Sequence, residues 1–330
     1  LKAGIPLLTA LHDLSATTEN RTLKEKISLI ARSVEMGSSL SEAFSQHRDI
    51  FPDILIRLTS VGEETGRLDQ SLREVSEHLQ RMEALTGAIK RALIYPAFAI
   101  TATIGAMIFW LVYVLPKLAN LFQELQIKLP AITRAVMAVS RFITMNWYLF
   151  VLTPVLLFLL YKGLRRNYSF RLKTDKLKLS IPVFNLILTN RILAVFSEQM
   201  RLLLNAGIAI DRIFEITAEV IGNEYVRRAV LQTKDEVMAG STIADALKAH
   251  PVFPPMLVRM VSVGEQTGGL DDQLGFLANF FIERLDDISQ RLGKMIEPIV
   301  IAVLGLFFMV IIIALLIPVY DLVSNIGAMR

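Results

Sequence analysis

Three stretches of the chain are apolar enough to cross a lipid bilayer. They cover residues 92–116, 142–161 and 298–320, and they hold 25, 20 and 23 consecutive residues without Asp, Glu, Lys, Arg or His. Since about 20 such residues carry a helix across the hydrocarbon core, we predict three transmembrane helices. Three buried helices of a soluble protein are the alternative, but soluble core helices rarely run so long without a charge.

The segments outside these stretches have the apolar spacing of amphipathic helices. In the second half of the chain, apolar side chains recur every three or four residues, which is the period of an α-helix. Gly207 and Gly240 stand where glycine commonly ends a helix. The predicted helices cover residues 191–205, 208–220, 224–238, 254–263 and 270–294, with a short helix after Ser241 or Thr242. Alternating Val/Ile/Thr runs are missing from the sequence, so we predict an all-helical fold.

The first half of the sequence is repeated in the second. Val61–Leu68 reads VGEETGRL and Val263–Leu270 reads VGEQTGGL, so six of eight positions are identical. From Phe51 onwards the copies are 202 residues apart, and up to His47 they are 203 apart, so one residue was gained or lost in between. We therefore predict the same helices in both copies. Two copies of a soluble domain with a membrane anchor place two similar surfaces on one side of a bilayer. That arrangement suggests a platform for partners more than a solitary active site.

The first copy starts in the middle of its first predicted helix. Leu1 aligns with Leu204, so nothing in this chain matches residues 191–203. A helix bundle without one of its helices exposes apolar surface. We therefore expect the natural protein to have residues before Leu1 that this chain lacks.

Positive charge is concentrated directly after the second apolar stretch. Residues 162–178 contain one acid, Asp175. They contain seven bases, which are Lys162, Arg165, Arg166, Arg171, Lys173, Lys176 and Lys178. Lys and Arg mark the cytoplasmic end of a membrane helix. We predict that this cluster is a juxtamembrane anchor and that both soluble domains are cytoplasmic, and we expect no nucleic-acid partner.

The predicted fold class is an all-α membrane protein, with two homologous cytoplasmic helical-bundle domains of about six helices each, the first one truncated, and three transmembrane helices. The first half of the chain is predicted to contain a cytoplasmic helical domain over 1–91, transmembrane helix 1 over 92–116 and a periplasmic loop over 117–141. Transmembrane helix 2 follows over 142–161, and a basic cytoplasmic linker over 162–182. The second cytoplasmic helical domain covers 183–297, transmembrane helix 3 covers 298–320, and a periplasmic tail covers 321–330.

The repeated Gly-Glu-x-Thr-Gly-x-Leu segments are the sharpest local signal. In each copy we expect the first glycine to end a helix, the second to make a turn, and the leucine to start the next helix. A tight, capped turn is one interpretation. The other is that Glu63 and Glu265 project from a rigid corner to meet a basic partner. Glu63 and Glu64 could also bind a hard cation such as calcium, but two adjacent carboxylates fall far short of a binding loop. The candidate partner-binding residues are Gly62, Glu63, Thr65, Gly66, Leu68, Gly264, Glu265, Thr267, Gly268 and Leu270.

Two proline-containing pairs mark the membrane junctions. They are Tyr95-Pro96 in the first copy and Glu297-Pro298 in the second. Proline is well tolerated in the first turn of a helix, where its missing N–H would have no partner. We expect each proline to stand at such a position and to allow a bend. No Gly/Ser-rich linker interrupts either junction, so we also expect the helices over 68–91 and 270–294 to lead straight into the anchors as rigid rods. Glu297 is expected to pair with a base one turn before it, Lys294 or Arg291.

No motif in the sequence points to catalysis, a cofactor or a metal. The four histidines, His12, His47, His78 and His250, show no i, i+4 pairing and no neighbouring Glu motif, and there is no cysteine. The GxxxxGK[ST], GxSxG, HExxH and GxGxxG patterns are missing. The apolar stretches carry no ionisable side chain other than tyrosine, which disfavours a carrier. We therefore predict that the chain is not an enzyme and has no catalytic, cofactor-binding or metal-ligating residues.

The order of these motifs resembles the inner-membrane platform protein of type IV pilus and type II secretion machines, the PilC/GspF family. The resemblance covers the whole chain, from Ala3-Gly4-Ile5 and the two VGE-x-TG-x-L segments to Leu129–Arg134, which is similar to the family's LPxxTR stretch. The chain departs from the pattern at its start, where the family has a further segment. It also has Gly269 where the first copy has Arg67, so the two corners need not bind alike.

The resemblance implies a function that the residues alone do not give. Family members are thought to lie in the bacterial inner membrane beneath the fibre, to contact a hexameric cytoplasmic ATPase, and to help move pilin or pseudopilin subunits into the fibre. Other expected partners are further inner-membrane assembly proteins, membrane lipids and copies of the chain itself in a homo-oligomer. The hypothesis is that motion of the ATPase turns or tilts the two domains, and that the helices pass this motion to the pilins.

Two other functions are weighed against this one. A static membrane adaptor would scaffold inner-membrane components without moving, and a transport subunit is disfavoured by the charge-free stretches. If the corners bind the ATPase, reversal of both Glu63 and Glu265 to Lys is expected to abolish assembly and to leave the protein folded.

Overall fold

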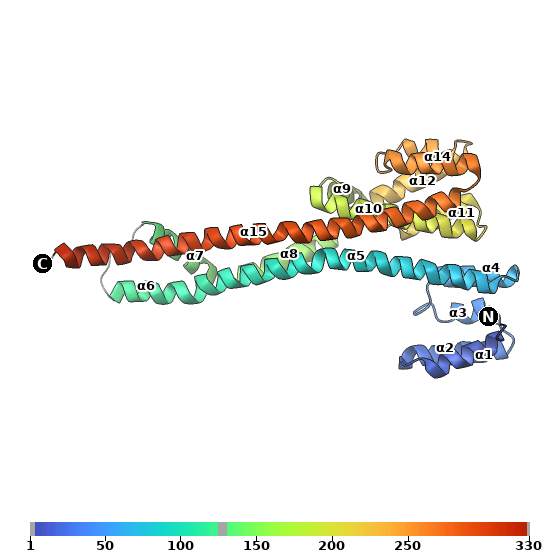
Figure 1. Ribbon diagram of the computed structural model, residues 1–330, viewed down its shortest axis with the longest axis horizontal. Helices are drawn as coiled ribbons and strands as arrows, with labels where there is room; N and C mark the ends of the chain where they lie inside the picture. Colours follow the sequence, from blue (N-terminus) through green and yellow to red (C-terminus); the bar gives the residue numbers. More distant parts are fainter. Residues whose placement is uncertain (1–3, 125–130, 329–330) are drawn as a thin grey trace. The chain divides into compact units, whose positions relative to one another are not determined.

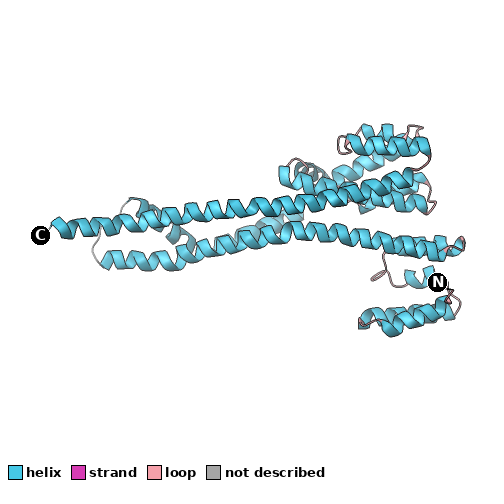
Figure 2. Cartoon of the chain, in the orientation of Figure 1, coloured by secondary structure: helices cyan, strands magenta, loops and turns pink. Residues whose placement is uncertain are grey.

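The computed structural model describes residues 4–124 and 131–328, and all regular structure within them is helical (Figures 1 and 2). The prediction of an all-helical fold is therefore confirmed. Three sequence features lie partly or wholly outside the described residues: the alignment of Leu1 with Leu204, the start of Ala3-Gly4-Ile5, and the Leu129-Pro130 part of the LPxxTR-like stretch.

The two copies fold into the same series of helices. In the first copy these are α1 (Leu7–Thr17), α2 (Arg21–Glu35), α3 (Leu40–Ser45), α4 (Asp53–Glu64) and α5 (Leu68–Phe109). In the second copy they are α11 (Ile210–Val220), α12 (Glu224–Met238), α13 (Ile243–Lys248), α14 (Pro255–Thr267) and α15 (Leu270–Ala328). The bounds of the first three pairs differ by 203, and the starts of the last two pairs differ by 202. The sequence repeat is thus a repeat of structure.

Equivalent polar residues begin equivalent helices in the two copies. Asn20 and Asn223 accept hydrogen bonds from the third backbone N–H of α2 and α12, both at 3.1 Å. Ser39 and Thr242 do the same for α3 and α13, at 3.1 and 3.0 Å. Such side chains satisfy backbone donors that a helix start leaves without a partner. Of the two residues predicted to cap the short helix of the second copy, Thr242 is the one that does so.

The remaining helices connect the copies and the apolar stretches. They are η1, a π-helical turn (Trp110–Val114), α6 (Leu115–Glu124), α7 (Ala131–Met145), α8 (Trp147–Leu164), α9 (Tyr168–Lys178) and α10 (Pro182–Asn205). The segment predicted as an outer loop therefore contains most of α6 and most of α7, and the predicted basic linker contains α9. Helix α10 begins at Pro182 and not at Arg191, because proline is favoured at the first helical position.

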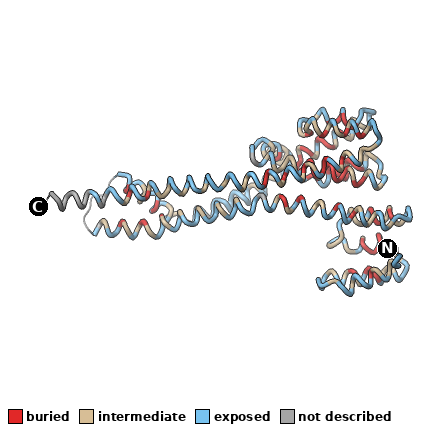
Figure 3. The backbone as a smooth tube through the Cα atoms, viewed as in Figure 1, coloured by how far each residue is buried: buried red, intermediate tan, exposed pale blue. Residues whose placement is uncertain are grey.

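The chain forms two compact units. Unit 1 consists of Leu1–Thr86 and Thr189–Ile282, and unit 2 consists of Gly87–Leu188 and Glu283–Arg330. Within unit 1, one core cluster gathers Leu11, Ile30 and Phe44 of the first copy. The second copy buries Phe196, Phe214 and other large side chains completely, and Figure 3 shows the buried positions concentrated on its helices. A small cluster of Leu58, Val75 and Leu202 joins α4 and α5 to α10, so each copy contributes to the interior of unit 1.

Unit 2 contains the apolar helices. The helical segments that are long and apolar enough to span a membrane are Leu68–Phe122, Trp147–Leu164 and Leu270–Ile317, which contain the three predicted transmembrane stretches or most of their length. Helix α8 exposes its apolar side chains on all sides. Two hydroxyl groups of α7 bind backbone carbonyls: Thr133 donates to Ala314 of α15 at 2.6 Å, and Ser140 donates to Leu111 of η1. Helix α7 is therefore packed against two other helices, with hydrogen bonds that suit an apolar surrounding.

Candidate functional site

Each repeated segment forms a corner between two helices. In the first corner α4 ends at Glu64 and α5 begins at Leu68, and in the second corner α14 ends at Thr267 and α15 begins at Leu270. Gly66 has φ 68° and Gly268 has φ 75°. This left-handed conformation is open to glycine and strained for most other residues. The predicted roles of these two glycines in the turns, and of Leu68 and Leu270 at the helix starts, are confirmed.

Gly62 and Gly264 do not end their helices, as the sequence suggested, but lie within the last turn of α4 and α14. A Cβ atom on Gly62 would lie 2.7 Å from Oγ of Ser71 and 3.0 Å from Cα of Leu68. A Cβ atom on Gly264 would lie 2.7 Å from Cα of Leu270. Glycine is required at both positions because the next helix starts directly against this turn.

The two corner glutamates bind the N-termini of neighbouring short helices. Glu63 accepts hydrogen bonds from the backbone N–H groups of Leu40 (2.5 Å) and Ser41 (3.2 Å) of α3, and from the Ser41 hydroxyl (2.5 Å). Glu265 accepts hydrogen bonds from the N–H groups of Ile243 (2.6 Å) and Ala244 (2.9 Å) of α13. Each carboxylate thereby satisfies free backbone donors and neutralises the positive end of a helix.

These contacts give Glu63 and Glu265 an intrachain role that the sequence left open between capping and partner binding. The side chains of both residues are only partly exposed. The surface that stays open at the first corner is formed by Glu64, Thr65, Gly66 and Arg67. The threonines stabilise the turns, since Thr65 donates to the carbonyl of Val61 at 2.7 Å, and Thr267 makes the equivalent bond to Val263 at 2.9 Å. Partner binding at the corners stays a prediction.

A cavity of about 520 Å³ lies beside the first corner. It is bounded by Thr65 and Arg67 of the corner, by Ser71 and Glu74 of α5, and by the Asn205–Gly207 turn that follows α10. Arg67 is exposed and forms no ion pair with any residue that the structure describes. The second corner has Gly269 at this position. The first corner therefore carries an unpaired cation in the lining of this cavity, and the second corner has no cation at the equivalent position.

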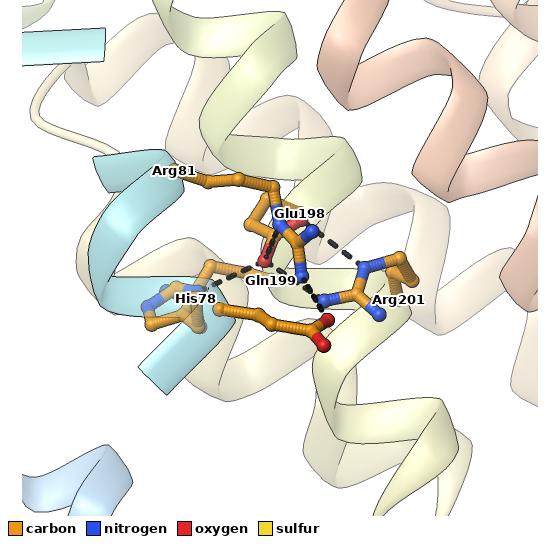
Figure 4. A network of polar contacts seen from close by, with 6 residues as sticks. His78, Arg81, Glu198, Gln199 and Arg201 are labelled. Atoms are coloured by element: carbon orange, nitrogen blue, oxygen red, sulfur yellow. Dashed lines mark hydrogen bonds and ion pairs between the residues drawn. The ribbon is translucent and has the colours of Figure 1, made fainter. Parts of the chain in front are cut away.

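A buried ionic cluster lies farther along α5 (Figure 4). Its centre is the carboxylate of Glu198 on α10, whose side chain has no exposed surface. His78 Nδ1 lies 3.2 Å from Oε1, Arg81 Nε donates to Oε1 at 2.9 Å, and Arg201 donates to both carboxylate oxygens at 3.1 and 3.0 Å. Gln199 lies 3.5 Å from the other ring nitrogen of His78. The cluster joins the first copy, which supplies His78 and Arg81, to the second within unit 1.

The electrostatics of the cluster favour an ionised carboxylate. Burial alone would raise the pKa of Glu198, but the hydrogen bonds from His78, Arg201 and Arg81 outweigh burial and lower its pKa to about 2. A buried anion of this kind is stable only while its cationic partners stay in place. The cluster therefore acts as a strong link between α5 and α10.

Sequence reasoning missed this cluster. His78 was considered only for metal binding and catalysis, and Glu198 was not singled out, because 120 positions separate the two residues. One signal was available. Glu198 lies between Phe196 and Met200 in a predicted helix that is rich in apolar residues, and a carboxylate buried in such a helix needs a partner.

The predicted membrane-junction residues lie inside continuous helices. Pro96 is within α5 and Pro298 is within α15, so the expectation that each proline stands in the first turn of a helix is wrong. A proline inside a helix removes one hydrogen bond, whereas a helix break next to lipid would leave several backbone groups without partners. Tyr95 and Glu297 are exposed, and within residues 4–124 and 131–328 Glu297 forms no ion pair with a base one turn before it.

Comparison with known proteins gives a consistent result over both copies. A family model described as type II secretion system (T2SS), protein F matches residues 1–116 and 196–318. The type IV pilus assembly protein PilC of Thermus thermophilus is 33% identical over 328 residues, which are 99% of this chain and 80% of that protein. The type IV pilus assembly protein TapC of Aeromonas hydrophila is 31% identical over 328 residues, 99% of this chain and 79% of that protein. The type II secretion system protein F of Xanthomonas campestris pv. campestris is 30% identical over 326 residues, 98% of this chain and 80% of that protein.

Proposed function

Since the chain belongs to the type II secretion system protein F family, in which type IV pilus assembly proteins such as PilC also fall, we propose that it couples a hexameric cytoplasmic ATPase to the insertion of pilin or pseudopilin subunits into a growing fibre. The chain is a membrane-spanning platform protein of pilus or secretion assembly, and members of the family are assembly components and not enzymes.

The observation that carries the proposal is the continuity of the two helices that follow the corners. Helix α15 runs from Leu270 at the second corner through a candidate membrane span to Ala328 without a break. Its 59 residues correspond to a length of about 90 Å at 1.5 Å per residue. Helix α5 likewise runs from Leu68 into the first apolar stretch. A displacement at either corner would reach the membrane through one hydrogen-bonded element, whereas a flexible linker would absorb it.

The proposed location is the inner membrane of a bacterium, with both helical domains in the cytoplasm. The orientation is supported by the seven bases of residues 162–178, which follow the apolar helix α8. The proposed partners are the ATPase, the fibre subunits, other inner-membrane assembly proteins, membrane lipids and further copies of the chain. The exposed apolar faces of α8 are available for such membrane contacts.

The corners are the proposed contact surface for the ATPase. They begin the two long helices, and their exposed residues include Thr65, Gly66, Thr267 and Gly268. The first corner adds Arg67, which forms no ion pair with a described residue and lines a cavity large enough for a side chain of a partner. We therefore expect an acidic group of the ATPase to meet the first corner.

Site-directed crosslinking tests the coupling, because the chain contains no cysteine. One cysteine replaces Gln70 beside the first corner, or Asp272 at the equivalent position beside the second. The ATPase is then trapped with ATP or with ADP. We expect crosslinks to the ATPase whose yield changes with the nucleotide, and none above background from a control cysteine at the exposed Arg228 of α12.

The outcomes separate the proposal from its alternative. Crosslinks that form at the corners with equal yield in both nucleotide states identify a static adaptor. A yield no higher than at the Arg228 control position removes the corners from the ATPase contact.

A further inference from the structure

The basic segment of residues 162–178 forms a small folded element in unit 2. Helix α8 ends at Leu164, a short turn follows, and α9 covers Tyr168–Lys178. The ring of Tyr161, in the last turn of α8, contacts the ring of Phe170 in α9, with 6.4 Å between the ring centroids. Helix α9 is therefore folded back onto the end of the membrane helix and does not trail from it as a free tail.

The one acid of this segment is used to hold the fold. Asp175 is 1% exposed, and it accepts hydrogen bonds from Arg165 at 3.2 Å and from Lys178 at 2.8 Å. Burial would lower the pKa of Lys178, but the hydrogen bonds to Asp175 and Tyr161 outweigh it and raise the pKa, so the amine stays charged. Asp175 thereby fixes α9 against α8 and leaves the surface of the segment positive.

Three cations of the segment remain at the surface. Lys162, Arg166 and Lys173 are exposed, and none of them forms an ion pair with a residue that the structure describes. The three cations are close to one another in sequence, and the single acid of residues 162–178 is buried, so the surface of this segment attracts anions. Lys162 directly follows the apolar span of α8, which places it at the depth of the lipid phosphates.

Large apolar side chains are exposed next to these cations. Tyr168 and Leu177 of α9 are 54% and 62% exposed, and Phe184 near the start of α10 is 62% exposed. Leu177 lies one helical turn after Lys173, on the same face of α9. A surface that combines free cations with exposed apolar side chains is typical of helices that lie in the interface between lipid headgroups and acyl chains. In water, the exposed apolar side chains of such a surface would be unfavourable.

We propose that the junction of α8 and α9 is a binding site for anionic phospholipid headgroups, in which Lys162, Arg166 and Lys173 contact the phosphates while Leu177, on the same face of α9 as Lys173, enters the acyl region. This site depends on α8 crossing the bilayer and does not depend on coupling to an ATPase, so the two proposals can fail separately. A nucleic acid would satisfy the cations but would leave the apolar side chains in water, and the observations therefore favour lipid.

The test uses the full chain reconstituted in phosphatidylcholine nanodiscs. A small fraction of spin-labelled phosphatidylglycerol or spin-labelled phosphatidylcholine is added, and electron paramagnetic resonance measures the immobilised fraction of each. We expect the chain to immobilise phosphatidylglycerol in preference to phosphatidylcholine. Since each cation near the membrane surface strengthens anionic binding about fivefold, the triple variant Lys162→Glu, Arg166→Glu, Lys173→Glu should lose this preference entirely.

Two further variants distinguish a specific lipid-binding site from a general effect of net charge. The matched control is Arg57→Glu, Arg228→Glu, Arg259→Glu, which changes the net charge by the same amount at exposed positions of unit 1 and should keep the preference. Asp175→Asn makes the segment more positive but removes the group that holds Arg165 and Lys178. If the lipid binds at a specific site, this variant should show a weaker preference for phosphatidylglycerol. If binding depends only on net positive charge, the preference should be stronger.

Several results would overturn the proposal. They are equal immobilisation of both lipids by the unaltered chain, loss of the preference in the matched control, or a stronger preference in Asp175→Asn. Millimolar glycerol 3-phosphate should leave the preference unchanged, because it lacks an acyl chain for Leu177, and displacement of the lipid by it would identify a site for soluble phosphates. Displacement by a homopolymer RNA would identify a nucleic-acid site instead. Circular dichroism of each variant shows that the helices are intact.

Discussion

Arg81 Nε lies 2.9 Å from Oε1 of Glu198, although 117 positions separate the two residues in sequence. The contact joins α5, which leads from the first corner, to α10, which belongs to the second copy. Because the carboxylate is fully buried and is shared with His78 and Arg201, this link resists separation of the two copies within unit 1. The two copies are therefore better described as one body than as two domains that move independently.

Glu198→Gln should destabilise unit 1 by about 3 kcal/mol, because it leaves two largely buried guanidinium groups without their counter-charge. The measurement is the free energy of unfolding of the purified chain in detergent. The matched control is Glu25→Gln, which removes the partner of Arg21 in an exposed ion pair and should leave the stability nearly unchanged. Equal stability of Glu198→Gln and the unaltered chain would mean that the ionic cluster makes no net contribution to the free energy of unfolding.

The stability of the link should depend on acid pH in a defined direction. The pKa of Glu198 is lowered in the folded chain from 4.5 to about 2. The unfolded chain therefore binds a proton first as the pH falls, and the stabilisation is complete above pH 4.5 and is lost progressively between pH 4.5 and about 2. The shift corresponds to about 3 kcal/mol.

Unfolding measured from pH 6 to pH 2.5 checks this dependence. The stability difference between the unaltered chain and Glu198→Gln should shrink across the lower half of this range, because the unfolded state of the unaltered chain binds a proton at Glu198 while the folded state does not. A difference that stays constant down to pH 2.5 would show that Glu198 does not titrate as the geometry requires.

The corner glutamates should act as helix caps of unequal strength. Glu63→Ala removes three hydrogen bonds to α3 and Glu265→Ala removes two to α13. We expect losses of about 1–2 kcal/mol each, with the larger loss at Glu63. Hydrogen exchange at the Leu40 and Ile243 amides should become faster in the respective variant. The control Glu64→Ala, at an exposed neighbour, should leave both amides protected.

These contacts change one expectation drawn from the sequence. Reversal of Glu63 and Glu265 to Lys was expected to leave the protein folded, but an ammonium group at these positions would face the positive ends of α3 and α13. A loss of assembly in the doubly reversed variant would therefore report on folding as much as on partner binding. The exposed residues Thr65 and Arg67 provide the cleaner test of binding.

The first glycine of each corner should tolerate no side chain. Gly62→Ala and Gly264→Ala place a methyl group within 3.0 Å of the start of the next helix, and we expect each to destabilise the chain by about 1–3 kcal/mol. Gly293→Ala is the control, since a Cβ atom there meets nothing within 4 Å, and it should be neutral or slightly stabilising. Unfolding midpoints in detergent compare the three. A neutral Gly62→Ala would show that α4 and α5 can move apart without loss.

Local signals in the sequence predicted much of this fold. The repeat, the helices of the second copy and the cap at Thr242 follow from spacing and capping within a few residues, and the structure contains them. The two helices that lead directly from the corners into the apolar stretches were also predicted, because no Gly/Ser-rich linker interrupts them. Only the place of Pro96 and Pro298 in a first helical turn was wrong, because the surrounding apolar sequence makes a helix break more costly than one lost hydrogen bond. The outer segment was predicted as a loop, although Thr133 and Ser140 bind carbonyls of other helices.

Only part of the candidate site could be predicted, because several of its contacts join residues that are far apart in the sequence. The turn glycines Gly66 and Gly268 could be read from their own segments. The partners of Glu63 lie 22 and 23 positions away, and those of Glu198 on α5 lie 117 and 120 positions away. The sequence indicates that a buried carboxylate needs a cationic partner, but the identity of that partner depends on the fold.

Arg67 should be the residue that distinguishes the two corners in function. It is exposed beside a cavity of about 520 Å³, has no ion pair with a described residue, and is replaced by Gly269 in the second corner. If an acidic group of the ATPase binds there, Arg67→Ala should lower the yield of the Gln70 crosslink to the ATPase about tenfold. The crosslink from Asp272 should change less. Arg67→Lys should restore part of the yield, because it keeps the charge and loses the planar guanidinium.

Two controls show whether a lower yield comes from the lost charge of Arg67 itself. Arg73→Ala removes an equally exposed cation one to two turns farther along α5 and should leave both crosslinks and fibre assembly unchanged. The unfolding midpoint of Arg67→Ala should equal that of the unaltered chain, since the Arg67 side chain forms no hydrogen bond or ion pair with a described residue and the backbone bond from Arg67 N–H to the Gly62 carbonyl is kept. Fibre assembly that continues at the normal rate in Arg67→Ala, with both crosslinks intact, would place the ATPase contact on another surface of unit 1.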